Sequence, residues 1–163
     1  MAKKVLIIST SIRANSNSEI LAAAFADGAR EAGNEVECVT LKDKTIALWG
    51  LAFKPETDDM REAPSIITLD LLTEIGCKVR VYDPVAMNAT KRRWGNVYCG
   101  VDMYDAVKGA DAVLLLTEWR QFRIPAWDRV KELMRTPVVI DGRNIYDYRE
   151  LEEQGFTYYC IGR

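Results

Sequence analysis

The chain has 163 residues, a net charge of −2 and a hydrophobic content of 48%, which allows a sizeable core. The balanced charge argues against nucleic-acid and membrane-surface partners, for which a basic excess is typical. Histidine is absent, which removes the commonest general base and metal ligand. The four scattered cysteines, at positions 38, 77, 99 and 160, favour buried reduced thiols over a zinc site or a thioredoxin-like motif.

Apolar, strand-like runs alternate with helix-period segments along the chain. The pattern predicts strands at 5–8, 36–41, 46–53, 79–82, 96–99, 113–116, 138–140 and 158–161, and helices at 18–31, 63–75, 103–108, 127–134 and 148–154. This alternation predicts an α/β fold of three layers (αβα) around a mainly parallel, Rossmann/flavodoxin-like sheet of about seven or eight strands.

A polar loop follows the first predicted strand and precedes a helix. It contains Ser9, Ser11, Arg13, Ser16, Asn17 and Ser18. Hydroxyl groups, one arginine and a helix N-terminus suit a phosphate, although Ser16 or Ser18 acting as a simple helix cap is the alternative. Residues 3–42 resemble the start of flavodoxin-like FMN proteins, specifically the NADPH-dependent FMN reductase and iron–sulfur flavoprotein group. The resemblance implies that these six residues hold the FMN phosphate, while the loops that would hold the flavin ring are not recognisable.

Five ordered motifs occupy the rest of the chain. They are Gly50–Pro55 with Thr57–Pro64, Tyr82–Pro84, Leu116–Trp119, Asp141–Asn144 and Tyr158–Arg163. With these motifs, residues 45–163 resemble the C-terminal, UDP-binding domain of the UDP-glucose/GDP-mannose dehydrogenase family. The resemblance implies that Phe53, Lys54 and Arg143 lie beside a UDP-sugar. Solvated loop charges are the alternative for Lys54 and Arg143.

Other polar and aromatic groups favour structural roles. Asp58, Asp59, Arg61 and Glu62 indicate a charged loop that caps the next helix rather than an acid/base or metal cluster, so no metal site is expected. The four tryptophans favour core or interface packing over a stacking platform.

Neither resemblance includes its chemically active half. The sequence has no G-x-G-x-x-G for NAD and no cysteine in a glycine- and serine-rich setting, so no catalytic residue is predicted. The interpretation is an engineered chimera without an evolved catalytic activity, not an enzyme. It requires no cofactor, with FMN as the one that its incomplete site allows, and it retains weak affinity for phosphate, FMN or a UDP-type ligand. FMN- or UDP-sugar-binding modules are the alternatives, and a working nucleotide-sugar dehydrogenase ranks last.

The two fragments meet at Lys42-Asp43-Lys44. We expect residues 1–163 to form a single α/β domain built from fragments 1–44 and 45–163, because forty residues are too few for an independent core. A homodimer is allowed. No signal peptide or transmembrane stretch is visible, so we expect cytoplasmic parent proteins and recombinant expression.

Overall fold

The computed structural model describes residues 4–9 and 17–162, which fall into two compact units. The smaller unit comprises residues 1–44 with Glu74–Cys77, and the larger comprises Thr45–Thr73 with Lys78–Arg163. The first boundary follows Lys44, the predicted joint, while the description of the whole chain as a single domain stays a prediction. No helix in the described ranges has both the length and the apolar character needed to cross a bilayer.

The smaller unit is a β-α-β element. Strands β1 (Lys4–Ser9) and β2 (Glu35–Thr40) run parallel, with Val5 opposite Val36, and helix α1 (Asn17–Glu31) connects them. The helix buries Ala26, and Gly33 follows its end with a φ of 79°, a conformation that glycine adopts without steric cost. Among the described residues these two strands pair only with each other. The expected single sheet of seven or eight strands is therefore two separately paired sheets in the described residues.

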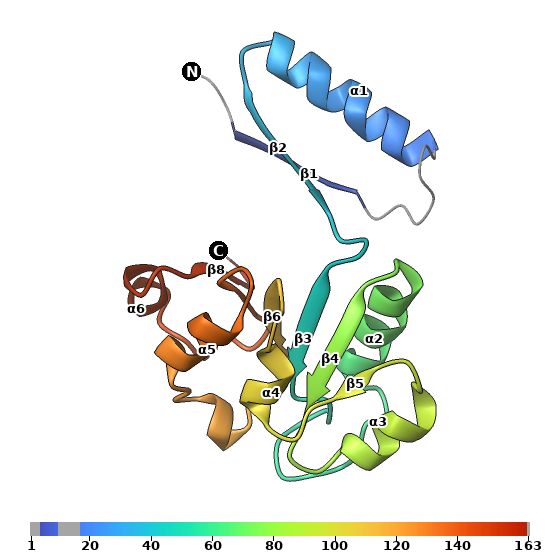
Figure 1. Ribbon diagram of the computed structural model, residues 1–163, viewed down its shortest axis with the longest axis vertical. Coiled ribbons are helices and arrows are strands. Elements are labelled where there is room, and N and C mark those ends of the chain that lie inside the picture. The colour runs from blue at the N-terminus through green and yellow to red at the C-terminus, as the bar shows by residue number, and fades with distance from the viewer. Residues whose placement is uncertain (1–3, 10–16, 163) are drawn as a thin grey trace. The chain divides into compact units, whose positions relative to one another are not determined.

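The larger unit contains a six-stranded parallel sheet, whereas about seven or eight strands were expected. The strand order is β5-β4-β3-β6-β7-β8 (Figure 1). The strands are β3 (Thr45–Trp49), β4 (Lys78–Tyr82), β5 (Tyr98–Cys99), β6 (Ala112–Leu115), β7 (Val138–Asp141) and β8 (Thr157–Cys160). The helices are α2 (Pro64–Glu74), α3 (Met87–Arg93), α4 (Met103–Val107), α5 (Trp127–Leu133) and α6 (Tyr148–Glu153), with a 3₁₀ turn η1 at Arg120–Phe122. The predicted three-layer, Rossmann-like α/β class is confirmed.

Strand β3 is central, and all five of its residues are buried. Ala47 and Trp49 point to one face, where they join a core that includes residues of β6, α4, α5 and α6. Trp49 is fully buried, stacks on Phe122 with 5.4 Å between ring centroids, and donates from Nε1 to the carbonyl of Met103. This packing confirms the structural interpretation of the tryptophans, since Trp94 and Trp119 are also buried.

Two elements differ most from the sequence prediction. The third strand ends at Trp49 rather than residue 53, because Gly50 turns the chain with a φ of 87°. Helix α3 was not predicted; Thr90 is its one buried residue, so its sequence carries no apolar period.

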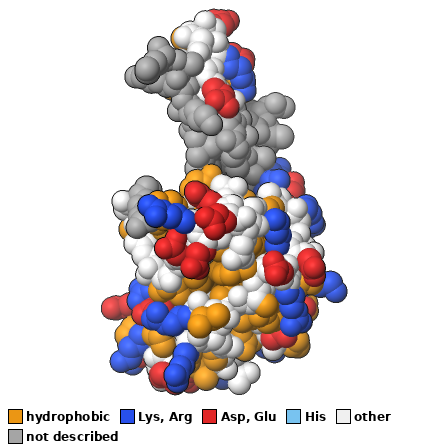
Figure 2. Space-filling view, turned by 90° about the vertical axis from the view of Figure 1, so that its left-hand side faces the viewer, with side chains coloured by type: hydrophobic (Ala, Val, Ile, Leu, Met, Phe, Trp, Pro, Cys, Tyr) orange, Lys and Arg blue, Asp and Glu red, His pale blue; other side chains and the backbone are white. Residues whose placement is uncertain are grey.

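The face in Figure 2 carries acidic and basic side chains side by side, with hydrophobic side chains exposed between them.

Candidate functional site

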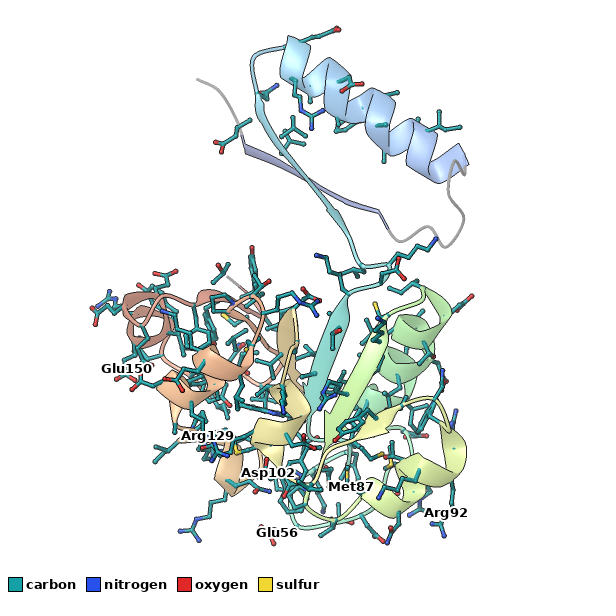
Figure 3. All side chains as sticks on the ribbon, viewed as in Figure 1. Glu56, Met87, Arg92, Asp102, Arg129 and Glu150 are labelled. Carbon is teal, nitrogen blue, oxygen red and sulfur yellow. The ribbon has the colours of Figure 1, made fainter. Side chains whose placement is uncertain are left out.

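The topology of the larger sheet singles out the ends of β3 and β6. From β3 the chain continues outward to β4 and β5, then returns to β6 and continues in the opposite direction to β7 and β8. In open parallel sheets, ligands bind outside the carboxyl ends of the strands at such a switch point. Glu56 and Met87, which follow β3 and β4, are at this end of the sheet in Figure 3, as is Asp102.

Asp83 joins the loops that follow β3, β4 and β6. It is 1% exposed, and its Oδ2 accepts hydrogen bonds from the backbone N–H groups of Leu51 and Ala52 at 2.7 and 3.2 Å and from Trp119 Nε1 at 3.1 Å. Its Oδ1 accepts from the N–H groups two and three residues further along the chain, at 2.9 and 2.8 Å. These five donors offset the cost of burying the carboxylate, so the residue fixes the loops to one another.

The tripeptide Thr117-Glu118-Trp119 links the loop after β6 to the loops after β3 and β4. Thr117 is buried and donates from Oγ1 to the carbonyl of Ala52 at 2.5 Å, while Trp119 reaches Asp83. The close approach depends on Gly50, where an added Cβ would lie 2.5 Å from the Thr117 Cβ and 2.7 Å from its backbone nitrogen. Glycine at this position is therefore what lets the two strand ends meet.

Arg143 follows β7 in a loop organised by a second buried aspartate. Asp141 is fully buried and accepts from the N–H of Arg143 at 2.8 Å, from Ile145 N at 2.8 Å and from Tyr158 Oη at 3.0 Å. Burial, together with the hydrogen bond to Asp141, raises the pKa of Tyr158 above its ordinary value. A Cβ on Gly142 would lie 2.8 Å from the Leu115 carbonyl oxygen, so this turn also requires glycine.

The Arg143 guanidinium forms a bidentate ion pair with Glu118. Its Nε donates to Oε2 at 2.5 Å and its Nη2 donates to Oε1 at 2.8 Å. The hydrogen bonds from Arg143 hold the pKa of Glu118 below its usual range. Arg143 is thus a cation held at the carboxyl edge of the sheet, 36% of its side chain exposed.

Phe53 and Lys54 lie in the loop after β3 and are both exposed. The Lys54 ammonium lies 5.2 Å from the centroid of the Phe53 ring, a cation–π arrangement. The backbone N–H of Phe53 donates to the carbonyl of Asp59 at 3.0 Å, which closes the loop on itself. The roles of Phe53, Lys54 and Arg143 toward a UDP-sugar stay predictions.

Six residues were predicted to hold an FMN phosphate. Ser11, Arg13 and Ser16 lie outside the described residues, and for Ser9, Asn17 and Ser18 only the backbone is described, at the end of β1 and the start of α1.

The charged loop before α2 pairs within itself rather than capping that helix. Arg61 donates to Asp59 from Nη2 at 2.6 Å and from its backbone N–H at 2.9 Å, which lowers the pKa of Asp59 to about 2. This loop lines a groove of about 850 Å³ together with α3, and a second groove of about 470 Å³ runs between Thr57, Val85 and Trp119. Within the described residues no group of histidine, cysteine and carboxylate side chains could hold a metal ion.

Asp83, Asp141 and Thr117 organise this edge and were not singled out individually from the sequence. Asp83 and Asp141 lie in the motifs Tyr82–Pro84 and Asp141–Asn144, and because they precede Pro84 and Gly142 they also carry the signal of turn residues at strand ends. Thr117 and Glu118 carried no signal beyond their place in a family motif.

Curated relatives match about three quarters of the chain. UDP-glucose 6-dehydrogenase of Pseudomonas aeruginosa is 47% identical over 126 residues, which is 74% of this chain and 28% of the relative. UDP-glucose 6-dehydrogenase YwqF of Bacillus subtilis is 46% identical over 124 residues, again 74% of this chain and 28% of the relative. The chain therefore spans a little over a quarter of the length of these relatives.

Solved structures of nucleotide-sugar dehydrogenases share the fold. A UDP-D-ManNAc dehydrogenase from Pyrococcus horikoshii aligns with a TM-score of 0.61 and 28% identity, covering 90% of this chain and 32% of that one. An NDP-N-acetyl-D-galactosaminuronic acid dehydrogenase from Methanosarcina mazei aligns with a TM-score of 0.65 and 25% identity, covering 93% and 33%.

These relatives correct four expectations. The interpretation as an engineered chimera without evolved activity is wrong, as is the conclusion that the chain has no enzymatic role, because close relatives are named as dehydrogenases. The expectations that no cofactor is required and that FMN is the one the site allows are also wrong, because dehydrogenation needs a hydride acceptor and the relatives are dehydrogenases of UDP-sugars. The interpretation relied on the absence of an NAD fingerprint and a cysteine motif. The chain matches only 28% of the length of the Pseudomonas aeruginosa relative, so the absence of these motifs from the chain says nothing about the activity of the relative.

The family model described as "UDP-glucose/GDP-mannose dehydrogenase family, UDP binding domain" matches residues 47–148, which span β3 to the start of α6 and include the switch point and all three predicted UDP-sugar residues. The segment predicted to resemble FMN proteins, residues 3–42, lies outside this match. The chain belongs to the UDP-glucose/GDP-mannose dehydrogenase family, through that family's UDP-binding domain.

Proposed function

We propose that the larger unit binds the nucleotide end of a UDP-sugar at the carboxyl edge of its sheet, as part of the oxidation of that sugar by a nucleotide-sugar dehydrogenase. The observation that carries the proposal is the switch point between β3 and β6, with Lys54 in the loop after β3 and Arg143 in the loop after β7, the other neighbour of β6.

Charge and shape support the same ligand. An ammonium and a guanidinium can both donate charge-assisted hydrogen bonds to a diphosphate. The 470 Å³ groove opens beside Val85 and Trp119, which follow β4 and β6, so the edge has room beside the loops that meet there. The exposed ring of Phe53, 41% accessible, offers an apolar surface to a uracil or sugar ring.

Hydride transfer is not assigned to this chain's residues. By resemblance the family uses NAD, but none of the ten glycines forms a G-x-G-x-x-G, the turn that binds the pyrophosphate of NAD. Our proposal gives the residues of this chain the task of holding and orienting the UDP-sugar.

Calorimetric titration of the purified chain with UDP and UDP-glucose tests the proposal. Removing one charge-assisted hydrogen-bond donor costs about 1.5–3 kcal/mol, so Lys54→Ala and Arg143→Ala should each weaken UDP binding roughly tenfold or more. Lys108→Ala, a change at an exposed lysine just after α4, is the matched control and should leave the affinity unchanged. Unchanged affinity in both site variants would rule out this edge as the binding site. The homodimer stays a prediction, which analytical ultracentrifugation would test.

A further inference from the structure

Glu118 follows the strand that lies between the two strands leading to the basic residues assigned to the ligand. It follows β6, whose neighbours β3 and β7 lead to Lys54 and Arg143, respectively. On either side of it in sequence, Thr117 and Trp119 are buried and hydrogen-bonded to Ala52 and Asp83. Glu118 is therefore mounted on backbone that is fixed at both flanking positions, and its own side chain is 23% exposed.

The ion pair with Glu118 uses two of the N–H donors of the Arg143 guanidinium. A guanidinium has five N–H donors in a planar fork. Glu118 takes the donor on Nε and one donor on Nη2, which form the side edge of the fork. The pair does not use the other three donors: one N–H of Nη2 and one of Nη1, which form the end edge, and the second N–H of Nη1. That end edge has the spacing for bidentate recognition of a phosphate.

We propose that Glu118 is a positioning residue for the nucleotide diphosphate: it grips the side edge of the Arg143 guanidinium and so directs the end edge toward the ligand's phosphates. The inference rests on the proposed function, because it assigns a partner to the arginine of that same site. Glu118 itself does not touch the ligand. A free arginine would lose rotamer entropy on binding, whereas one already held loses little.

The ion pair would weaken ligand binding instead if the Glu118 carboxylate competed with the ligand's phosphates for the Arg143 guanidinium. Two anions near one guanidinium repel, so removing Glu118 would then strengthen binding. The five-donor fork favours the positioning role, because the two anions use different edges and need not exclude one another.

Calorimetric titration of the full chain with UDP separates these outcomes. Glu118→Gln should weaken UDP binding by roughly 3- to 10-fold, the effect of releasing one long side chain. Glu118→Asp retains the charge but shortens the reach by one methylene group, so we expect a similar loss. In an Arg143→Ala background, Glu118→Gln should change the affinity by less than about twofold, because a positioning residue has nothing left to position. Glu132→Gln, at an exposed glutamate of α5, is the control.

Affinity equal to or above wild type in Glu118→Gln, or an undiminished effect in the Arg143→Ala background, would overturn the positioning role while leaving the proposed function intact. No binding of UDP by the wild-type chain would overturn the proposed function and this inference with it, whereas no effect of Arg143→Ala would overturn this inference. Thermal unfolding followed by tryptophan fluorescence verifies that each variant is folded before titration.

Discussion

Replacing Asp83 by asparagine tests whether one buried carboxylate holds the carboxyl edge of the sheet together. Asparagine has nearly the same shape but keeps only one acceptor oxygen. Asp83 accepts three hydrogen bonds on Oδ2 and two on Oδ1. At least two buried N–H donors must then face the new amide hydrogens, at about 1–3 kcal/mol each, and the remaining bonds lose the assistance of the charge. We expect the free energy of unfolding to fall by about 4 kcal/mol.

Urea unfolding followed by tryptophan fluorescence measures this loss. All four tryptophans, at positions 49, 94, 119 and 127, lie in the larger unit, so the signal reports the unit that contains Asp83. With a urea m-value of about 2 kcal/mol/M, the midpoint should fall by about 2 M. Asp128→Asn, an exposed change in the first turn of α5, is the matched control and should shift the midpoint little. A loss below about 1 kcal/mol for Asp83→Asn would refute the reasoning that its hydrogen bonds fix the loops.

Three further predictions follow from single contacts. Gly50→Ala should destabilise the larger unit by about 3 kcal/mol or more in the same urea assay, because the new Cβ is strained at a φ of 87° and lies 2.5 Å from the Thr117 Cβ. The control is Gly95→Ala, where the new Cβ has nothing within 4 Å, and it should cost less than about 1 kcal/mol. Arg61→Gln should raise the pKa of Asp59 from about 2 toward 3.8, read from its carboxyl carbon by NMR, and an unmoved midpoint would contradict the pairing. The raised pKa of Tyr158 means that its contribution to stability is full below pH 10 and declines as pH rises above it. Tyr158→Phe should therefore flatten the loss of stability at alkaline pH, and an unchanged slope would exclude that residue as its source.

The strands of the larger sheet could be predicted because strands that are buried on both faces consist of continuous runs of apolar residues. β3 and β6 lie at the centre of the sheet, and their apolar runs predict strands buried on both faces. The end of β3 was misplaced because Leu51 and Ala52 continue the apolar run and are buried, yet belong to the loop held by Asp83. Pattern alone does not distinguish a buried loop from a strand.

The separate pairing of β1 with β2 could not be predicted from local sequence. Their apolar pattern predicts parallel strands with a crossover helix, which is what forms. Which other strands they join depends on contacts between distant segments, and the right-handedness of crossovers leaves several arrangements open.

The site could be predicted only through family motifs. Lys54 and Arg143 are ordinary loop cations by composition, and their assignment depends on motif resemblance. The ion pair between Glu118 and Arg143 joins residues 25 positions apart, so only the pairing of β6 with β7 brings them together. Asp141 is likewise unremarkable in sequence, because its role depends on Tyr158, a residue of another strand.

The two buried aspartates also affect the entropy and the heat-capacity change of ligand binding. Asp83 and Asp141 fix the loops after β3, β4, β6 and β7 through backbone hydrogen bonds made within the chain itself. The conformational entropy of ordering these loops is therefore lost during folding rather than on association. A nucleotide entering this edge would meet loops that are already in place, so its binding should carry a small heat-capacity change, close to that expected from the buried ligand surface alone.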